Sequence, residues 1–326
     1  VLAVLLALGG IVSLRPLAPV LLLPPIHVLA MSLLPLLVLW PVGRALRGKG
    51  GSWRDVIAGM AGGGFLGMTF ALIGEGLIVL AVIIIVTIVA MVTPGGPERI
   101  QELASRIQDP DWIADAQNLL PLLLSPAVVL STLGILSIPV PLLEESVKTL
   151  ATGVAGRWLR PTPARAFLWG VAGGAGFALA ENLFNGALGG VEGWLPGAIS
   201  RFGATVMHCF TGGLVGWGWG QLWTARRPWR LLGCYAAAVL VHAVWNTSAV
   251  GVAFLSVGLM AQKGRVLQVT FMLLGMLAFL GLLVLLTLVF LVALTVVGHR
   301  LAAQVEQAQE QTPVVVATSL PEAPSC

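Results

Sequence analysis

Residues Pro141-Leu-Leu-Glu-Glu-Ser-Val-Lys-Thr-Leu150 place two adjacent carboxylates and a lysine inside a segment that is otherwise apolar. On a helix, Lys148 can reach Glu144 four residues before it or Glu145 three residues before it. An ionised side chain near the centre of a bilayer costs roughly 2.5–3.5 kcal/mol on insertion scales, and such residues are usually paired and functional. This stretch therefore indicates a functional site buried in a membrane-embedded fold.

The composition of the whole chain identifies lipid as the solvent. Hydrophobic residues make up 57% of the 326 positions and charged residues 10%, with a mean hydropathy of +0.95. A soluble domain averages about 25% charged residues. We therefore predict an all-α fold, a polytopic helical membrane bundle of about ten transmembrane helices. The net charge of +4 does not predict a nucleic-acid partner, because the excess lysine and arginine lie in short loops.

Basic loops predict how the helices are oriented. Short loops rich in lysine and arginine stay in the cytoplasm. Basic residues are concentrated in residues 44–54, in residues 157–165, in residues 226–230 and at His299-Arg300. Alternating spans between these loops predict a multi-pass protein of the cell membrane with both termini in the cytoplasm. The first 23 residues are apolar, but prolines leave the helix boundaries there open.

The apolar block of residues 55–92 is too long for one span of about 20 residues. It is expected to split at Gly74-Glu-Gly76 into two helices, with Glu75 at an outer turn. The glycine run at residues 62–67 predicts close helix packing rather than a phosphate loop, because no strand precedes it.

Residues 93–118 form the longest polar insertion. Ile100, Leu103 and Ile107 recur at helical spacing, which predicts a short amphipathic helix on the membrane surface. The segment carries five acidic and two basic residues. An ordinary solvated face and a docking surface both fit this pattern.

Three further segments carry polar side chains inside apolar runs. These side chains are Glu181 and Asn182, His208, and His242 with Asn246. His242 and Asn246 are four apart and so share one face of a helix. A membrane asparagine most often joins helices, and a single histidine is often structural.

Depth in the bilayer predicts that these side chains belong together. At 1.5 Å per residue from the nearest cytoplasmic arginine, Glu145 and His242 lie about 18 Å deep, Glu181 about 24 Å and His208 about 27 Å. The hydrocarbon core is about 30 Å thick. Four helices therefore bring ionisable groups to the same outer half of the membrane.

Two kinds of hydrolytic chemistry fit this set. In the first, Glu145 takes a proton from water and returns it to a leaving amine, assisted by Glu144 and with Lys148 orienting the second carboxylate. His208, His242 and Asn246 then stabilise an oxyanion. In the second, Glu181, His208 and His242 bind a divalent metal such as zinc, and Glu145 acts as base. No HExxH pattern is present, so the metal version is the less specific of the two, and the choice between them stays open.

The ordered motifs resemble those of the PrsW family of intramembrane proteases, a distant relative of the CAAX prenyl proteases and bacteriocin-processing enzymes. The resemblance covers about residues 119–258 and rests on Glu144-Glu145-Ser-Val-Lys148, Phe177-Ala-Leu-Ala-Glu181-Asn182, His208 and His242-Ala-Val-Trp-Asn246. Lys148 and the Glu181-Asn182 pair separate the chain from the CAAX branch. The resemblance implies that Glu144 and Glu145 are the catalytic pair, with His208 and His242 in the site. It also implies cleavage of a single-pass membrane protein near its outer face, typically an anti-sigma factor in envelope-stress signalling.

From these patterns we predict that the chain has four regions. Residues 1–118 hold N-terminal transmembrane helices and the polar loop, residues 119–258 the catalytic core, residues 259–302 a C-terminal transmembrane helix, and residues 303–326 a flexible tail.

Two rival functions would use the buried ionisable residues differently. A proton-coupled transporter would use the buried carboxylates and histidines as a relay and predicts inverted repeats, of which no clear one is visible. A non-enzymatic scaffold would use them as a structural ion-pair cluster.

Overall fold

The computed structural model describes residues 1–15, 18–188, 193–261 and 266–311, and this part of the chain is helical with no strand. The helices are α1 (Leu2–Ser13), α2 (Ala18–Ala45), α3 (Trp53–Ala61), the π-helix η1 (Gly62–Gly67), α4 (Met68–Val92), α5 (Gly96–Ile107), α6 (Pro110–Ala114), α7 (Ala116–Leu123), α8 (Pro126–Ser137), α9 (Pro139–Val147), α10 (Leu150–Leu159), α11 (Pro163–Leu188), α12 (Trp194–Ala225), α13 (Pro228–Ala261) and α14 (Val266–Glu310). The predicted all-α membrane bundle is confirmed.

Among the described residues, six helices or continuous helical runs are long and apolar enough to cross a membrane. The expected count of about ten is not confirmed. Residues 126–159, which form α8, α9 and α10, make one such run rather than several. The 32-residue helix α12 is not among the six, although it is long enough to cross. It lies inside the bundle, so it needs no lipid-facing apolar surface.

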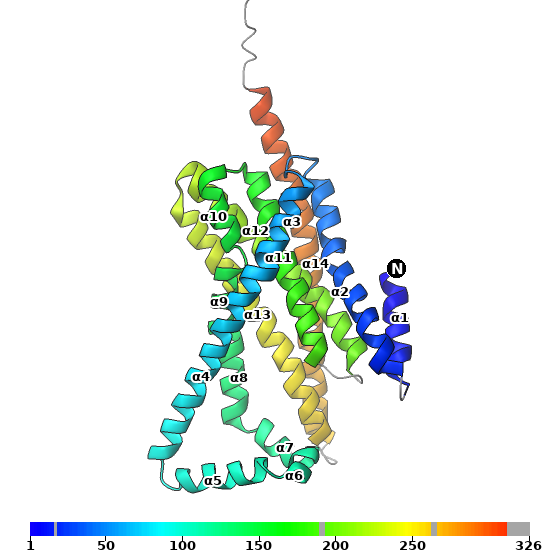
Figure 1. Cartoon of the computed structure of the whole chain (residues 1–326), viewed down its shortest axis with the longest axis vertical. Helices are drawn as coiled ribbons and strands as arrows, with labels where there is room; N and C mark the ends of the chain where they lie inside the picture. Colours follow the sequence, from blue (N-terminus) through cyan, green and yellow to red (C-terminus); the bar gives the residue numbers. More distant parts are fainter. Residues whose placement is uncertain (16–17, 189–192, 262–265, 312–326) are drawn as a thin grey trace, which may run out of the picture.

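The long helices run between two ends of the molecule, which we call the arginine end and the acidic end (Figure 1). The α2–α3, α10–α11 and α12–α13 connections lie at the arginine end, and α14 reaches it as well. A Cβ on Gly298 of α14 would lie 2.9 Å from Ala45, and Arg47 pairs with Glu306 at 3.8 Å. The four basic positions therefore share one end, as alternation predicted. Helices α5, α6 and α7 lie at the opposite end.

The predicted turn at Glu75 is wrong, because α4 continues through Gly74-Glu-Gly76. Gly74 instead lets α9 approach closely: a Cβ at this position would lie 2.4 Å from Cδ2 of Leu143. A small residue thus serves helix packing here rather than a turn. Glu75 consequently lies half-buried in the middle of a helix, one residue beyond the crossing of α4 and α9.

The predicted surface helix exists as α5, which contains Ile100, Leu103 and Ile107. Helix α5 ends at Ile107, and Asp109 then caps α6 by accepting from the amide of Asp111. At the other end, α14 continues to Glu310, so residues 303–310 are helical and the predicted start of the tail is wrong there. The rest of the predicted tail, residues 312–326, lies outside the described residues.

Glycines allow three helices to pack backbone against backbone at the centre of the bundle. A Cβ on Gly63 of η1 would lie 1.9 Å from the carbonyl oxygen of Gly173 in α11, and one on Gly174 would lie 2.0 Å from that of His208 in α12. The packing role predicted for the glycine run is therefore confirmed. The same contacts draw α12 against α11 at the height of His208.

This packing predicts that Gly63→Ala disrupts folding. The new methyl group must push η1 away from the α11 backbone, which costs about 1–3 kcal/mol or more. Gly43→Ala is the matched control, because a Cβ at Gly43 meets nothing within 4 Å. Size-exclusion profiles of detergent-solubilised protein should show loss of the folded peak for Gly63→Ala alone. Equal profiles would contradict the packing argument.

Candidate active site

A break between α9 and α10 positions the central lysine. Helix α9 ends at Val147, the amide of Lys148 donates to the carbonyl of Glu144 at 3.0 Å, and α10 begins at Leu150. The backbone at the break is enclosed: Cβ atoms on Gly67 and Gly173 would lie 3.1 and 2.8 Å from the Cα and the carbonyl oxygen of Lys148. Irregular backbone at membrane depth is tolerated where protein buries it. The break thus lies inside the bundle beside η1 and α11.

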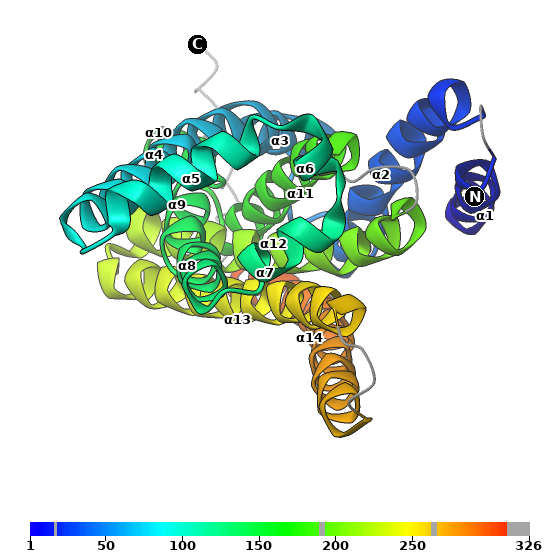
Figure 2. The same ribbon diagram turned by 90° about the horizontal axis from the view of Figure 1, so that it is seen from below.

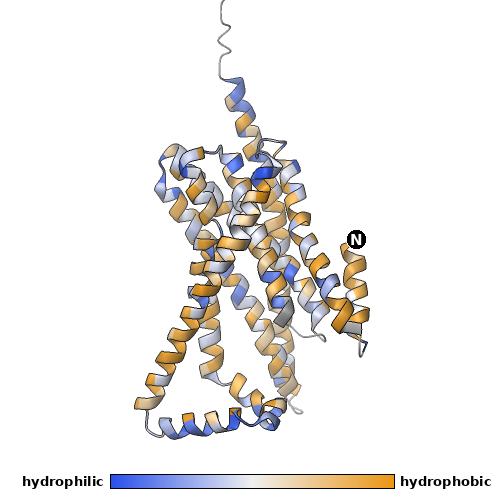
Figure 3. Cartoon of the chain, in the orientation of Figure 1, coloured by the Kyte–Doolittle hydropathy of each residue, from blue (hydrophilic) through white to orange (hydrophobic). Residues whose placement is uncertain are grey.

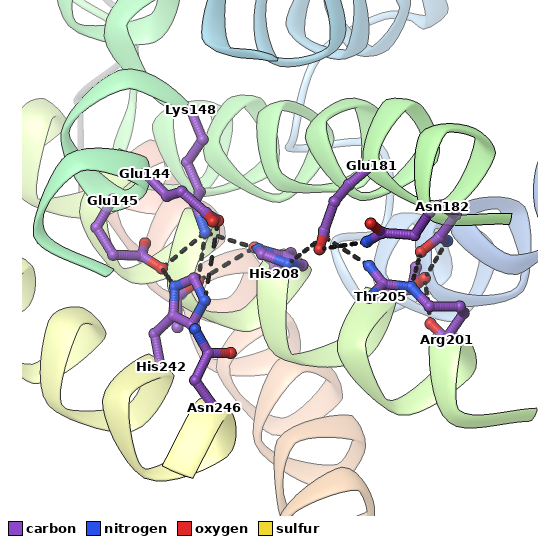
Figure 4. A network of polar contacts seen from close by, with 12 residues as sticks. Glu144, Glu145, Lys148, Glu181, Asn182, Arg201, Thr205, His208, His242 and Asn246 are labelled. Atoms are coloured by element: carbon purple, nitrogen blue, oxygen red, sulfur yellow. Dashed lines mark hydrogen bonds and ion pairs between the residues drawn. The ribbon is translucent and has the colours of Figure 1, made fainter. Parts of the chain in front are cut away.

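Glu145 accepts two contacts through one carboxylate oxygen (Figure 4). Its Oε1 accepts a hydrogen bond from Nζ of Lys148 at 2.7 Å and lies 2.8 Å from Nδ1 of His242 on α13. The side chains of Glu145 and Lys148 are fully buried. Of the two carboxylates that the lysine can reach on a helix, it contacts the one three residues before it. Because Oε1 holds Nδ1 of His242, the Nε2 atom of that ring points to the remaining groups.

His208 on α12 joins this cluster to α11. Its Nδ1 lies 2.8 Å from Nζ of Lys148, and its Nε2 lies 2.9 Å from Oε2 of Glu181. With Lys148 donating to Nδ1, the neutral ring carries its proton on Nε2 and donates it to Glu181. The rings of His208 and His242 meet edge to face, with centroids 5.1 Å apart. Side chains from α9, α11, α12 and α13 therefore form one connected set.

An arginine that the sequence reasoning missed extends the set toward the acidic end. Arg201 of α12 pairs through Nη2 with Oε2 of Glu181 at 2.6 Å and donates from Nε to Oδ1 of Asn182. Asn182 in turn donates to Thr205 at 3.0 Å, so it joins α11 to α12. Arg201 lies seven residues before His208, two turns earlier on the same face of α12. That spacing is the signal that would have found it.

Glu144 is the least satisfied member of the cluster. It is 6% exposed, its Oε2 has no hydrogen-bond partner among the described residues, and this oxygen lies 3.8 Å from Nε2 of His242. Potential ligand atoms of Glu144, His208 and His242 lie within 4.8 Å of one another. The corresponding Oε2 of Glu145 is also buried without a hydrogen-bond partner. Each of the two glutamates thus has a buried oxygen with unused capacity to accept a proton or bind a cation.

The comparison with known families identifies the family of the chain. The sequence model of the PrsW family intramembrane metalloproteases matches residues 52–280, which is most of the chain. The chain belongs to the PrsW family. Neither a search of curated proteins nor a search of solved structures gave a match. The chain is therefore a multi-pass integral membrane peptidase of this family.

The PrsW match is wider than the region 119–258 that carried the motifs. It begins at Ser52, which caps α3, and ends within α14. It includes the glycine run that supports Lys148, and it includes Glu75 on α4. Glu75 interacts with Glu144 and Glu181, so it is a fourth carboxylate near the cluster. The signal for Glu75 in the sequence is an acidic residue within an apolar run, although its flanking glycines also fit a turn.

The metalloprotease description of the PrsW family raises the question whether these residues fit a metal. Two imidazoles and a carboxylate are a common donor set for catalytic zinc. The unpartnered Oε2 of Glu144 fits a cation, because a buried carboxylate oxygen without a partner is costly. The set differs from the predicted one in its carboxylate, since Glu181 contacts His208 and Arg201 instead. Coordination through Nδ1 of His208 would replace the contact of that atom with Lys148.

Asn246 lies next to the cluster, but its amide has another partner. Its Nδ2 donates to the carbonyl of Leu136 at 2.8 Å, and Thr247 beside it contacts Ser137 at 2.7 Å. Both contacts join α13 to α8. The structure therefore brings together the other seven predicted residues, whereas Asn246 contacts the wall that supports them.

Glu145 also lines a cavity of about 290 Å³ between α9, the break that follows it, α12 and α13. Ser146, Thr149 and Tyr235 line it together with apolar side chains such as Val215 and Leu231. The volume is large enough for several waters.

Proposed function

We propose that this PrsW-family chain hydrolyses a peptide bond of a single-pass membrane protein, and that Glu144, Glu145, His208 and His242 carry the reaction. The observation behind this proposal is the convergence of two glutamates and two histidines from three helices, with one buried, unpartnered oxygen on each glutamate. Proton transfer and carbonyl polarisation need such groups side by side in a site that excludes most water.

In the proposed mechanism, Glu145 is the general base. Its Oε1 is held by Lys148 and His242, so the carboxylate keeps one orientation and Oε2 accepts the proton of the attacking water. The same oxygen then returns the proton to the leaving amine nitrogen. Lys148 supports this step by compensating the charge of Glu145 in a fully buried position.

Glu144, His208 and His242 would hold a divalent metal such as zinc. A metal bound there would polarise the substrate carbonyl and neutralise the charge that develops on its oxygen. Glu145 orients His242 through Nδ1, and Glu181 orients His208 through Nε2, as carboxylates commonly do for metal-bound imidazoles. Arg201 and Asn182 hold Glu181 in turn.

The arrangement of the cluster supports cleavage near the outer face. The positive-inside rule assigns the arginine end to the cytoplasm, and with it the C-terminal end of α14. From His208 the polar contacts continue through Glu181 to Arg201, toward the acidic end, where the side chains of Glu181 and Arg201 are 21% and 19% exposed. We therefore propose the cell membrane as the location. We also propose an outward-facing substrate such as an anti-sigma factor of an envelope-stress response.

Mass spectrometry of peptide termini tests the function. Cells with the wild-type chain are compared with cells carrying His208→Ala or His242→Ala at matched membrane levels, with Glu306→Gln as a surface control. New termini near the outer ends of single-pass proteins should appear with wild type and control and vanish in both histidine variants. Unchanged termini in correctly inserted variants would instead favour the transporter or scaffold function.

Metal content separates the two candidate ligand sets. We expect purified wild-type protein to bind zinc, and Glu144→Gln or His242→Ala to lose it. Glu181→Gln should keep the metal with affinity lowered by about 10- to 100-fold, because Glu181 acts through His208. Elemental analysis and chelator competition measure both quantities. Retention by Glu144→Gln with loss in Glu181→Gln would support the set of Glu181, His208 and His242.

A further inference from the structure

Among the described residues, no other transmembrane helix buries the half of α4 nearest the acidic end. Within the described chain, α4 contacts η1, α9 and α11, and it contacts α5, which follows it directly. Residues 77–92 include none that is buried, and Ile83, Ile85 and Ile88 are 56%, 59% and 57% exposed. Every side of this helical stretch is therefore uncovered, including the side that faces the rest of the protein.

Helix α4 lies close to α9 in the middle of the molecule, and from there α4 and α8 diverge toward the acidic end (Figure 1). The view along the molecule also shows them apart, with α5, α6 and α7 connecting their far ends (Figure 2). Colouring by hydropathy shows two apolar sides, α4 and α8, and a hydrophilic base, α5 (Figure 3). We call these three sides the α4–α8 frame. At its narrow end Gly74 packs on Leu143, directly beside Glu75 and Glu144.

The base of the frame differs in charge from the rest of the protein. Residues 93–118 carry five acidic and two basic residues in a chain whose net charge is +4. The acidic residues are all exposed, and Glu102 pairs with Arg106 of the same helix. The connection is thus acidic at the membrane surface, at the wide end of the frame.

From this arrangement we infer that the transmembrane segment of the substrate enters between α4 and α8, and that the acidic connection selects substrates with a basic outer flank. The inference rests on the function proposed above and adds a route and a charge preference to it. The frame is apolar where a membrane segment would lie and acidic where its outer flank would emerge. Its narrow end lies at Glu144, whose Oε2 is buried and unpartnered.

Site-specific photocrosslinking tests the route without requiring cleavage. The probes are two synthetic single-pass peptides that share one apolar segment of about 20 residues and differ in an outer flank of lysines or of glutamates. Full-length His242→Ala protein in phosphatidylcholine vesicles carries a photoreactive residue at Ile83, Ile84, Ile85 or Val86. Successive positions on a helix point about 100° apart, so these four sample every side of α4. Leu285 on α14, which is 57% exposed, is the lipid-facing control.

A docked peptide should crosslink at one or two adjacent faces of α4 and much more than at Leu285. At low salt the lysine-flanked peptide should crosslink faster by on the order of tenfold, because opposite charges accelerate encounter. The combined substitutions Glu98→Gln, Glu102→Gln and Asp111→Asn should remove this preference without moving the crosslinked face. Equal crosslinking at all four positions and at Leu285 would overturn the route, since it describes a surface covered by lipid. Crosslinking on one face with no charge preference would overturn the selection by α5–α7.

These outcomes are independent of the cleavage experiment. Crosslinking on one face without wild-type cleavage of any membrane protein would contradict the proposed function and leave the docking site standing. Cleavage with uniform crosslinking would leave the function standing and exclude the α4–α8 frame as the entry route.

Discussion

Glu145→Gln is expected to lower the rate of peptide hydrolysis by about 10²- to 10⁴-fold, the usual contribution of a general base. Glutamine keeps the size of the side chain, and its carbonyl oxygen can still accept a hydrogen bond from Lys148. Its amide NH₂ group, however, cannot take a proton from water. The measurement is the rate at which the cleaved terminus of the identified substrate appears in membranes with matched protein levels.

Two comparisons make this result specific. Glu306→Gln removes a carboxylate that pairs with Arg47 at the arginine end and should leave the rate unchanged. Glu145→Asp keeps a carboxylate but shortens the reach, so it should recover part of the rate. Full activity of Glu145→Gln together with loss in Glu144→Gln would assign the base to Glu144 instead.

Lys148→Met is expected to destabilise the protein by about 3–5 kcal/mol, because removing one partner leaves the other charge buried and uncompensated. The side chains of Lys148 and Glu145 are both 0% exposed, and the bridge between them measures 2.7 Å. Methionine has a similar length, so the effect isolates the charge. The midpoint of unfolding in a detergent titration, followed by tryptophan fluorescence, measures the loss.

A double-mutant cycle separates this charge effect from packing. Lys148→Met combined with Glu145→Gln removes both charges and should restore most of the lost stability. Arg106→Met is the matched control, because it removes an exposed ion pair with Glu102 that contributes about 0–1 kcal/mol. A double variant as unstable as Lys148→Met alone would mean that the methionine side chain, and not the unpaired carboxylate, causes the loss.

Much of the site was predictable because burial of charge in lipid is costly and therefore rare. Glu144, Glu145, Lys148, Glu181, His208 and His242 stood out as ionisable groups inside apolar runs, and counting from arginines gave their depths. The six now belong to one connected set. Arg201 was missed because an arginine close to a helix end is also explained by the membrane interface.

Helix boundaries were less predictable where glycine was the signal. Glycine permits a turn and permits close packing equally well, so Gly74 and Gly76 did not distinguish a hairpin from a continuous helix. The contact of Gly74 with Leu143 comes from another part of the chain, and it selects the continuous helix. The same contact brings Glu75 beside Glu144, so the error in one helix also hid one carboxylate.

Composition and spacing alone identify a helical membrane bundle, its basic end and the side chains of its polar centre, because each of these follows from the local cost of placing a residue in lipid. The pairing of these side chains depends on which backbones come into contact. Lys148 contacts Glu145 and His208. Glu144, rather than Glu181, forms the group of potential metal ligands with the two histidines. The break after α9 and the glycine contacts between η1, α11 and α12 set these distances. Such contacts join residues far apart in the chain, and no periodicity within one helix contains them.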